Sequence, residues 1–230
     1  MDHPIPSRDA APDATAPLVL ALPKGRILEE AGGLLAAAGI VPAADFFDEN
    51  ARRLRFETSD PALDVVRVRP FDVATFVAHG AAAIGICGAD VLMEFDYPEI
   101  YAPLDLAIGR CRVSVAEPAA TAGQDDPSRW SRVTVATKYP NIAQRHFAAR
   151  GIHAEIVHLN GAMELAPSLG LSRLIVDLVQ TGSTLKANGL VETEVIAPVT
   201  SRLIVNRTAL KTQPERIGAL VARVRMALAA

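Results

Sequence analysis

The sequence of 230 residues has little cysteine and no long apolar run. Cys87 and Cys111 are its only cysteines, and without a C-x-x-C pair they argue against a structural zinc site. Two unpaired thiols fit a reducing compartment. No run approaches about 18 apolar residues, so we expect no membrane-spanning helix. Residues 1–17 have several prolines and acids but no apolar centre, which predicts a disordered tail and not a signal peptide. Together these features predict a cytoplasmic protein.

The sequence also has no excess of positive charge, with 23 Lys and Arg against 26 Asp and Glu. A general binder of nucleic acid or of a membrane surface would be basic, so both classes are disfavoured. The balance leaves room for a small anionic substrate, because a few local cations are enough to bind one. Half of the residues are hydrophobic and only 21% are charged, which excludes a wholly disordered chain.

Short apolar runs alternate with amphipathic segments from Leu18 onward, and this alternation predicts an α/β fold with helices on the faces of parallel sheets. Strands are expected at 18–22, 82–87, 133–137 and 173–179, and helices are expected to begin near Arg26, Pro70, Pro140 and Pro214. We expect two lobes around a central cleft. Residues 18–104 and 196–230 would form lobe I, and residues 105–195 would form lobe II.

The clearest chemical signal is LIVDLVQTGST, at residues 174–184. A buried strand carries Asp177, and small hydroxyl residues (Thr181, Ser183, Thr184) then surround Gly182 ahead of a helix start. Glycine permits close approach of the backbone to an anion, and hydroxyl groups and a helix N-terminus add donors and partial positive charge. The pattern favours a phosphate site in which Asp177 binds sugar hydroxyls. The alternative is a loop that only caps a helix, with Asp177 as a turn residue.

Clusters of basic residues are the second signal. Lys24 and Arg26 flank Gly25 at a helix start, where cations oppose the helix dipole at a cost of up to about 1 kcal/mol that an anionic ligand would offset. Further basic residues, which predict polyphosphate binding, are Arg52, Arg53, Arg55, Arg67 and Arg69. The alternative for each of them is a solvated side chain on a half-exposed hairpin.

Two polar residues follow expected strands and are candidates for contact with a nucleotide. Asp90 follows the run that ends at Gly88 and could bind a base or ribose, or could be only the first-turn acid of its helix. Tyr139 follows residues 133–137 and could stack on a base, or could only pack against Pro140. No H-x-x-x-H pair and no G-x-S-x-G motif occurs, so we assign neither a metal-ligand set nor a serine nucleophile.

The order of the motifs resembles the ATP phosphoribosyltransferase family, which begins histidine biosynthesis. The segments that carry the resemblance are LALPKGR, RRLRF, VATKYPN, LNGAMELAP and D-x-x-x-T-G-x-T-L-x-A-N-G-L, between about residues 18 and 212. The chain ends 18 residues after Thr212, which is similar to the short form of the family. The resemblance implies two α/β lobes like those of a periplasmic binding protein.

The resemblance further implies a pentosyltransferase that joins N1 of ATP to C1 of phosphoribosyl pyrophosphate and releases pyrophosphate, with Mg²⁺. It assigns Asp177 and the loop Thr181–Thr184 to the ribose and 5′-phosphate. Lys24, Arg26 and Arg52 would be catalytic cations at the pyrophosphate or ATP phosphates, and Asp90 and Tyr139 would contact ATP. It also implies a regulatory subunit resembling histidyl-tRNA synthetase. The rival functions are a non-catalytic, effector-sensing domain of the same shape and a phosphoribosyltransferase acting on another base.

Overall fold

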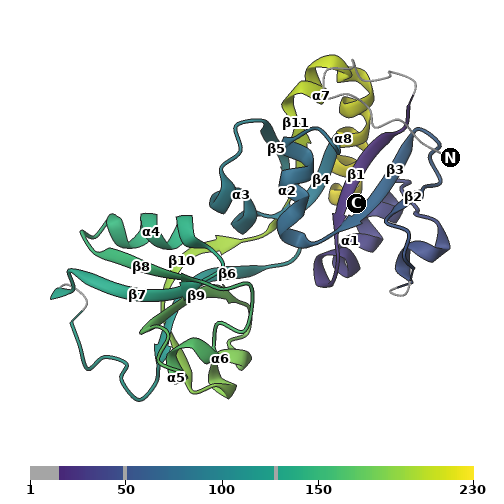
Figure 1. Ribbon diagram of the computed structural model, residues 1–230. Helices are drawn as coiled ribbons and strands as arrows, with labels where there is room; N and C mark the ends of the chain where they lie inside the picture. The colour runs from purple at the N-terminus through teal and green to yellow at the C-terminus, as the bar shows by residue number, and fades with distance from the viewer. Residues whose placement is uncertain (1–15, 49–50, 127–128) are drawn as a thin grey trace. The chain divides into compact units, whose positions relative to one another are not determined.

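The computed structural model describes residues 16–48, 51–126 and 129–230, so the expected tail of residues 1–17 lies almost wholly outside the described residues. The described chain forms two compact units (Figure 1). Unit 1 comprises residues 16–86, Glu99–Leu104 and Ile204–Ala230, and unit 2 comprises Cys87–Pro98 and Asp105–Leu203. The C-terminal segment therefore packs in the same unit as the first strand. Residues 87–98 and 196–203, which the sequence pattern had placed in lobe I, belong to unit 2.

The first sheet has six strands in the order β2-β3-β1-β4-β11-β5. Its central strand β1 runs parallel to both β3 and β4, whereas β2 pairs antiparallel with β3 at the edge. The strands are β1 (Leu18–Pro23), β2 (Arg55–Glu57), β3 (Leu63–Val68), β4 (Ile84–Gly88), β5 (Ile100–Asp105) and β11 (Ser201–Asn206). The β2–β3 pair is antiparallel because the short turn between the two strands cannot make the crossover that parallel strands need.

Three helices of unit 1 begin where the sequence predicts, at Arg26, Pro70 and Pro214, and two more are present among the described residues. The helices are α1 (Arg26–Ala37), the 3₁₀ helix η1 (Ala44–Phe47), α2 (Pro70–Ala78), α7 (Arg207–Thr212) and α8 (Pro214–Ala229). Helix α2 packs on β1, and α1 packs beside α8. Helix α8 buries Ile217, Leu220, Val221 and Val224, the stripe expected from their spacing. The sequence analysis did not predict η1 or α7.

Unit 2 is built on five strands in the order β10-β6-β9-β7-β8. The strands are β6 (Cys111–Pro118), β7 (Arg132–Thr137), β8 (His153–His158), β9 (Leu174–Val179) and β10 (Leu190–Val199). Strand β7 is parallel to β8 and β9, and β6 is antiparallel to β9 and β10. The helices are α3 (Ala89–Phe95), α4 (Pro140–Ala148), α5 (Leu165–Ser168) and α6 (Ser183–Ala187). Figure 1 shows α4 on one face of this sheet and α5 and α6 on the other.

Strand β10 contains an irregularity that separates two acidic residues. Its register against β6 shifts between Glu192, opposite Ala116, and Glu194, opposite Val115. Because neighbouring positions of β6 face opposite sides, the bulge sends the two carboxylates to opposite faces of the sheet. Glu192 pairs with Arg112 on β6, and Glu194 pairs with Arg150 after α4.

The α/β fold class and its two-lobed organisation are confirmed. No helix among the described residues is both long enough and apolar enough to cross a bilayer.

Candidate functional site

The loop between β9 and α6 is open on its outer side. Gly182 has φ +79°, in the left-handed region that favours glycine, and α6 begins at the next residue. A Cβ at Gly182 would meet only Val179, at 4.0 Å. The Thr181 hydroxyl lies 2.9 Å from that of Ser183 and accepts the Ser183 N–H at 3.3 Å. Thr181, Ser183 and Thr184 are all exposed, so their hydroxyls are accessible to a ligand.

Asp177 lies on β9, two residues before that strand ends. Its Oδ1 accepts the backbone N–H of Leu178 at 2.8 Å and lies 3.7 Å from Nζ of Lys138. Burial raises the pKa of Asp177 above its ordinary value, and Lys138 acts in the opposite direction. The structure thus places a carboxylate with a perturbed pKa close to a glycine loop, as functional sites often do.

Asp90 and Tyr139 form a buried pair. The Tyr139 hydroxyl donates to Oδ2 of Asp90 at 2.7 Å. Tyr139 is 0% exposed and Asp90 is 5% exposed. The ring of Tyr139 therefore has no exposed face in this structure, which favours the packing alternative over stacking on a base. Burial and the neighbouring Asp90 raise the pKa of Tyr139, so its hydroxyl keeps its proton and remains a donor. Contact of these residues with ATP remains a prediction.

Glu94 joins α3 to the beginning of α4. Its carboxylate accepts the backbone N–H of Asn141 at 2.9 Å and of Ile142 at 3.0 Å, which are donors in the first turn of α4 that have no partner within the helix. The Asn141 side chain donates in turn to the Glu94 carbonyl at 3.1 Å. A buried acid from another helix therefore caps α4 and fixes the segment that carries Tyr139.

A second network holds the beginning of the glycine loop. Arg112 donates to Glu192 and, through Nη1, to the carbonyl of Gln180 at 3.0 Å. Ser114 also donates to Glu192, at 2.7 Å. The hydrogen bond from Arg112 lowers the pKa of Glu192, so this carboxylate stays charged at neutral pH. Because Gln180 directly precedes the loop, the network fixes where the loop begins.

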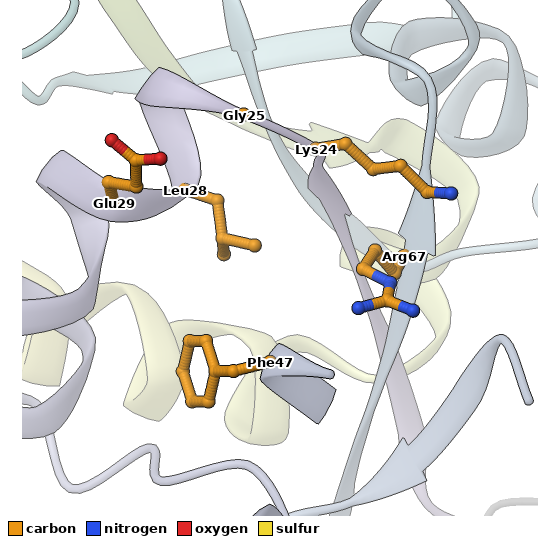
Figure 2. A pocket seen from close by; sticks show the side chains of 6 residues that line it. All are labelled: Lys24, Gly25, Leu28, Glu29, Phe47 and Arg67. Carbon is orange, nitrogen blue, oxygen red and sulfur yellow. The ribbon is translucent and has the colours of Figure 1, made fainter. Parts of the chain in front are cut away.

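Unit 1 contains a pocket of about 390 Å³ (Figure 2). Lys24 and Arg67 lie on one side and Glu29 on the opposite side, with Leu28 and Phe47 between them. Lys24 directly follows β1, and Arg67 lies on the neighbouring strand β3, which explains why the two cations share one wall. The pocket thus combines positive charge with an apolar wall.

Arg67 supports the chain segment before Arg52. Its side chain is 5% exposed, and it donates to the carbonyls of Phe46 at 2.6 Å, Asp48 at 3.0 Å and Ala51 at 3.3 Å. These contacts favour a structural role for Arg67 over polyphosphate binding, because both terminal nitrogens of its guanidinium donate to backbone carbonyls.

Two other arginines of the basic clusters form ion pairs on the surface. Arg53 pairs with Asp45 at 3.1 Å and with Glu57 at 3.2 Å, and Arg55 pairs with Asp64 at 2.7 Å. The β2–β3 hairpin and η1 thereby bring acids to these arginines, so the sequence cluster is not a continuous anion site.

The remaining candidate cations of unit 1 are Lys24, Arg26, Arg52 and Arg69. Arg26 begins α1 and lies 3.5 Å from Glu30, one turn further along. Lys24 and Arg52 are exposed, as is Arg69 at the N-cap position of α2. Lys24, Arg26 and Arg52 therefore keep charged groups at the surface of unit 1.

Sequence reasoning missed the partnership of Lys138 with Asp177 and the capping role of Glu94. Neither has a local signal. The first depends on the register of β7 against β9, and the second joins residues 47 positions apart. Glu94 is the second acid, after Asp90, in the otherwise apolar helix ADVLMEF, and that pattern does not show which group it contacts.

The two α/β units, with an acid-bearing strand that leads into a glycine loop, define a ligand-binding protein of the two-lobed class. The family model of ATP phosphoribosyltransferase matches residues 69–226. An ATP phosphoribosyltransferase of Gluconobacter oxydans (strain 621H) is 68% identical over 220 residues, covering 96% of this chain and 91% of that protein. The chain therefore belongs to the ATP phosphoribosyltransferase family, as its motifs predict, and the pentosyltransferase class is confirmed.

Solved structures agree with this assignment. A chain of the "ATP phosphoribosyl transferase (HisG:HisZ) complex from Thermotoga maritima" matches with TM-score 0.77 and 34% identity, over 92% of this chain and 97% of that chain. The alkanesulfonate-binding protein SsuA from Xanthomonas axonopodis pv. citri matches with TM-score 0.55 and 12% identity, over 92% of this chain and 73% of that chain. The second likeness concerns the fold alone and agrees with the expected likeness to periplasmic binding proteins.

Proposed function

We propose that this chain is the catalytic subunit of ATP phosphoribosyltransferase and transfers phosphoribosyl from phosphoribosyl pyrophosphate to N1 of ATP. The N1 lone pair forms a bond to C1 of the ribose as the bond from C1 to pyrophosphate breaks. Membership of the family over most of the chain carries the proposal. The reaction needs positioned donors and cations more than a nucleophile, since charge develops on the leaving pyrophosphate and on the ribose ring.

Unit 2 supplies the groups suited to the phosphoribosyl moiety. Asp177 would accept hydrogen bonds from the ribose hydroxyls, and the loop Thr181–Thr184 would bind the 5′-phosphate with its N–H and hydroxyl groups. The open space over Gly182 supports this role, because a phosphate can approach the backbone there. Asp90 and Tyr139 would act together on the adenine nucleotide, with Tyr139 orienting the Asp90 carboxylate through its hydrogen bond.

Unit 1 supplies the cations. Lys24, Arg26 and Arg52 would face the pyrophosphate or the ATP phosphates, where their charge would stabilise the leaving group. Arg67 would contribute indirectly, because it holds the backbone that leads to Arg52.

The Mg²⁺ ion of the reaction would be held chiefly by pyrophosphate oxygens, since Mg²⁺ commonly arrives with substrate phosphates and keeps several water ligands. Across residues 16–48, 51–126 and 129–230, no three His, Cys, Asp or Glu side chains lie close enough together to hold a metal.

A regulatory subunit resembling histidyl-tRNA synthetase would complete the enzyme. The solved relative from Thermotoga maritima is a two-protein HisG:HisZ complex, which supports such a partner here. We further propose a cytoplasmic location, which suits a chain whose two cysteines, Cys87 and Cys111, are not joined in a disulfide. The full chain alone should be insensitive to histidine, and its mixture with the partner should be inhibited. The measurement is the initial rate against histidine concentration, and inhibition of the chain alone at the same concentrations would contradict this arrangement.

The activity itself is tested by release of pyrophosphate when the full chain is mixed with ATP and phosphoribosyl pyrophosphate. Release with ATP but not with GTP or a free base separates this function from another phosphoribosyltransferase. Binding of either compound without release would identify an effector-sensing domain instead. Ser183→Ala should weaken binding of phosphoribosyl pyrophosphate, whereas Ser168→Ala, an exposed serine on the short helix α5 of the same unit, should not.

A further inference from the structure

Lys138 lies beside Asp177 as a consequence of strand register. The parallel strands β7 and β9 pair Thr137, the last residue of β7, with Val176, and Lys138 and Asp177 directly follow these two residues. Nζ of Lys138 is 3.7 Å from Oδ1 of Asp177, and the two side chains are 27% and 17% exposed. Their charges therefore interact in a partly dehydrated environment, where the attraction exceeds that in bulk water.

Hydrogen bonds on both sides hold the backbone of Lys138 in place. The Thr137 hydroxyl donates to the Val176 carbonyl at 2.6 Å and accepts the Tyr139 N–H at 2.8 Å. Tyr139 is itself anchored through its hydroxyl to Asp90, and the ammonium of Lys138 lies 5.1 Å from the centre of the Tyr139 ring. The position of Lys138 is thus set by buried contacts of its neighbours.

Besides Lys138, the charged groups that act on the pKa of Asp177 are the acids Glu164 and Asp90. The groups that interact with this carboxylate are Lys138 after β7, Glu164 before α5, Asp90 on α3 and the Tyr139 hydroxyl. On the neighbouring strand β6, Ser114 pairs with Asp177 in the register but donates its hydroxyl to Glu192, which also pairs with Arg112. Burial, Glu164 and Asp90 all raise the pKa of Asp177, and Lys138 lowers it. The Tyr139 hydroxyl stays protonated, and Ser114 carries no charge. Lys138 is therefore the cation in this group that opposes protonation of the carboxylate.

We propose that Lys138 is a positioning residue that keeps Asp177 ionised and oriented for the hydroxyls of the bound phosphoribosyl substrate. This inference rests on the function proposed above for Asp177. An ionised carboxylate offers acceptor sites on both oxygens, whereas a protonated one turns one oxygen into a donor. Lys138 thus extends the range of binding toward acidic pH, where the ribose site would otherwise lose its acceptor.

The test is calorimetric binding of phosphoribosyl pyrophosphate to the full chain between about pH 5.5 and about pH 8.5. Loss of a cation at this distance raises a carboxyl pKa by about 1–3 units. In Lys138→Gln the acidic limb of the binding profile, which is the pH range over which affinity falls as the pH is lowered, should therefore shift to higher pH by at least about one unit. Affinity should fall about tenfold near the acidic end of the range and much less at its alkaline end. Lys138→Met should behave in the same way, and Lys138→Arg should restore the wild-type profile.

Lys186→Gln is the matched control, because it removes the same charge from an exposed position in the last turn of α6. Its profile should coincide with that of the wild type. Asp177→Asn should lose affinity and also lose the contribution of this carboxyl to the acidic limb. In that background, Lys138→Gln should add less than about a twofold change, because coupled residues are not additive.

Two results would overturn the proposal: a profile unshifted in both Lys138→Gln and Lys138→Met, or a loss of affinity that is equal at every pH and persists with Asp177→Asn. The second result would mean that Lys138 contacts the substrate directly. Wild-type chain that fails to bind phosphoribosyl pyrophosphate at every pH would instead refute the proposed function, and this inference with it.

Discussion

Replacing Gly88 with alanine should break the buried Asp90–Tyr139 pair without straining the backbone. Gly88 has φ −67° and ψ 148°, which alanine adopts freely. A Cβ at this position would lie 2.0 Å from Oδ1 and 3.2 Å from Cγ of Asp90. The carboxylate must therefore rotate away, and the 2.7 Å hydrogen bond from Tyr139 is lost.

The expected cost follows from the groups left behind. A hydrogen bond to a charged acceptor contributes about 1.5–3 kcal/mol, and the upper part of that range applies because the Tyr139 hydroxyl is left buried without its acceptor. Alanine also restricts the conformations of the unfolded chain, and this stabilisation offsets about 0.4–1 kcal/mol of the cost of the lost hydrogen bond. We therefore expect Gly88→Ala to lower the free energy of unfolding by a net value of about 2 kcal/mol.

A double-mutant cycle in urea isolates this contact. The three atoms nearest to the added Cβ all belong to Asp90, so Gly88→Ala should be neutral or slightly stabilising once Asp90→Ala is present. Gly218→Ala is the control: its Cβ would meet no atom within 4 Å in α8, and it should stabilise the chain by up to about 1 kcal/mol. An equal cost of Gly88→Ala in both backgrounds would refute the reasoning.

Three further outcomes are expected. Gly182→Val should abolish binding of phosphoribosyl pyrophosphate in calorimetry and cost about 1–2 kcal/mol of stability, because a β-branched residue is strained at φ +79°; unchanged affinity would contradict the assignment of the loop. Arg52→Ala should lower kcat more than it raises KM, since leaving-group charge grows in the transition state, and a rise in KM alone would make Arg52 a simple binding residue. Because the pKa of Asp177 is raised in the folded chain, its ionisation opposes folding above its ordinary pKa. Asp177→Asn should therefore unfold at higher urea than the wild type at pH 7, with the difference shrinking as the pH falls toward about 4, and a difference independent of pH would count against this.

Much of the fold was predictable because its signals are local. Pro70, Pro140 and Pro214 each occupy the first turn of a helix. A backbone N–H there has no acceptor within the helix, so proline costs no hydrogen bond, and these helix starts could be located from the sequence. Gly39, just after α1, has a left-handed φ of +71°, as a glycine that ends a helix commonly does, and this helix end could also be located from the sequence. The glycine loop was recognisable because its chemistry lies within a few consecutive residues.

The contacts that complete the candidate site are not local, and the sequence did not reveal them. Arg67 has the same hydrophilic character as Arg53, yet one is buried against carbonyls and the other pairs with acids at the surface. Tyr139 follows its strand as expected, but its burial depends on Asp90, which lies 49 residues away. The register of strands and the packing of helices decide such pairings, and the local sequence pattern predicts neither of them.

The assignment of residues 87–98 to unit 2 limits how the chain can be divided into fragments. A fragment of residues 105–203 would contain the whole second sheet but would lack α3. The Tyr139 hydroxyl would then lose its acceptor Asp90, and the first turn of α4 would lose its cap Glu94. Expression of that fragment should give an unstable product, and a peptide of residues 87–98 added in trans, or joined to it by a linker, should restore its fold.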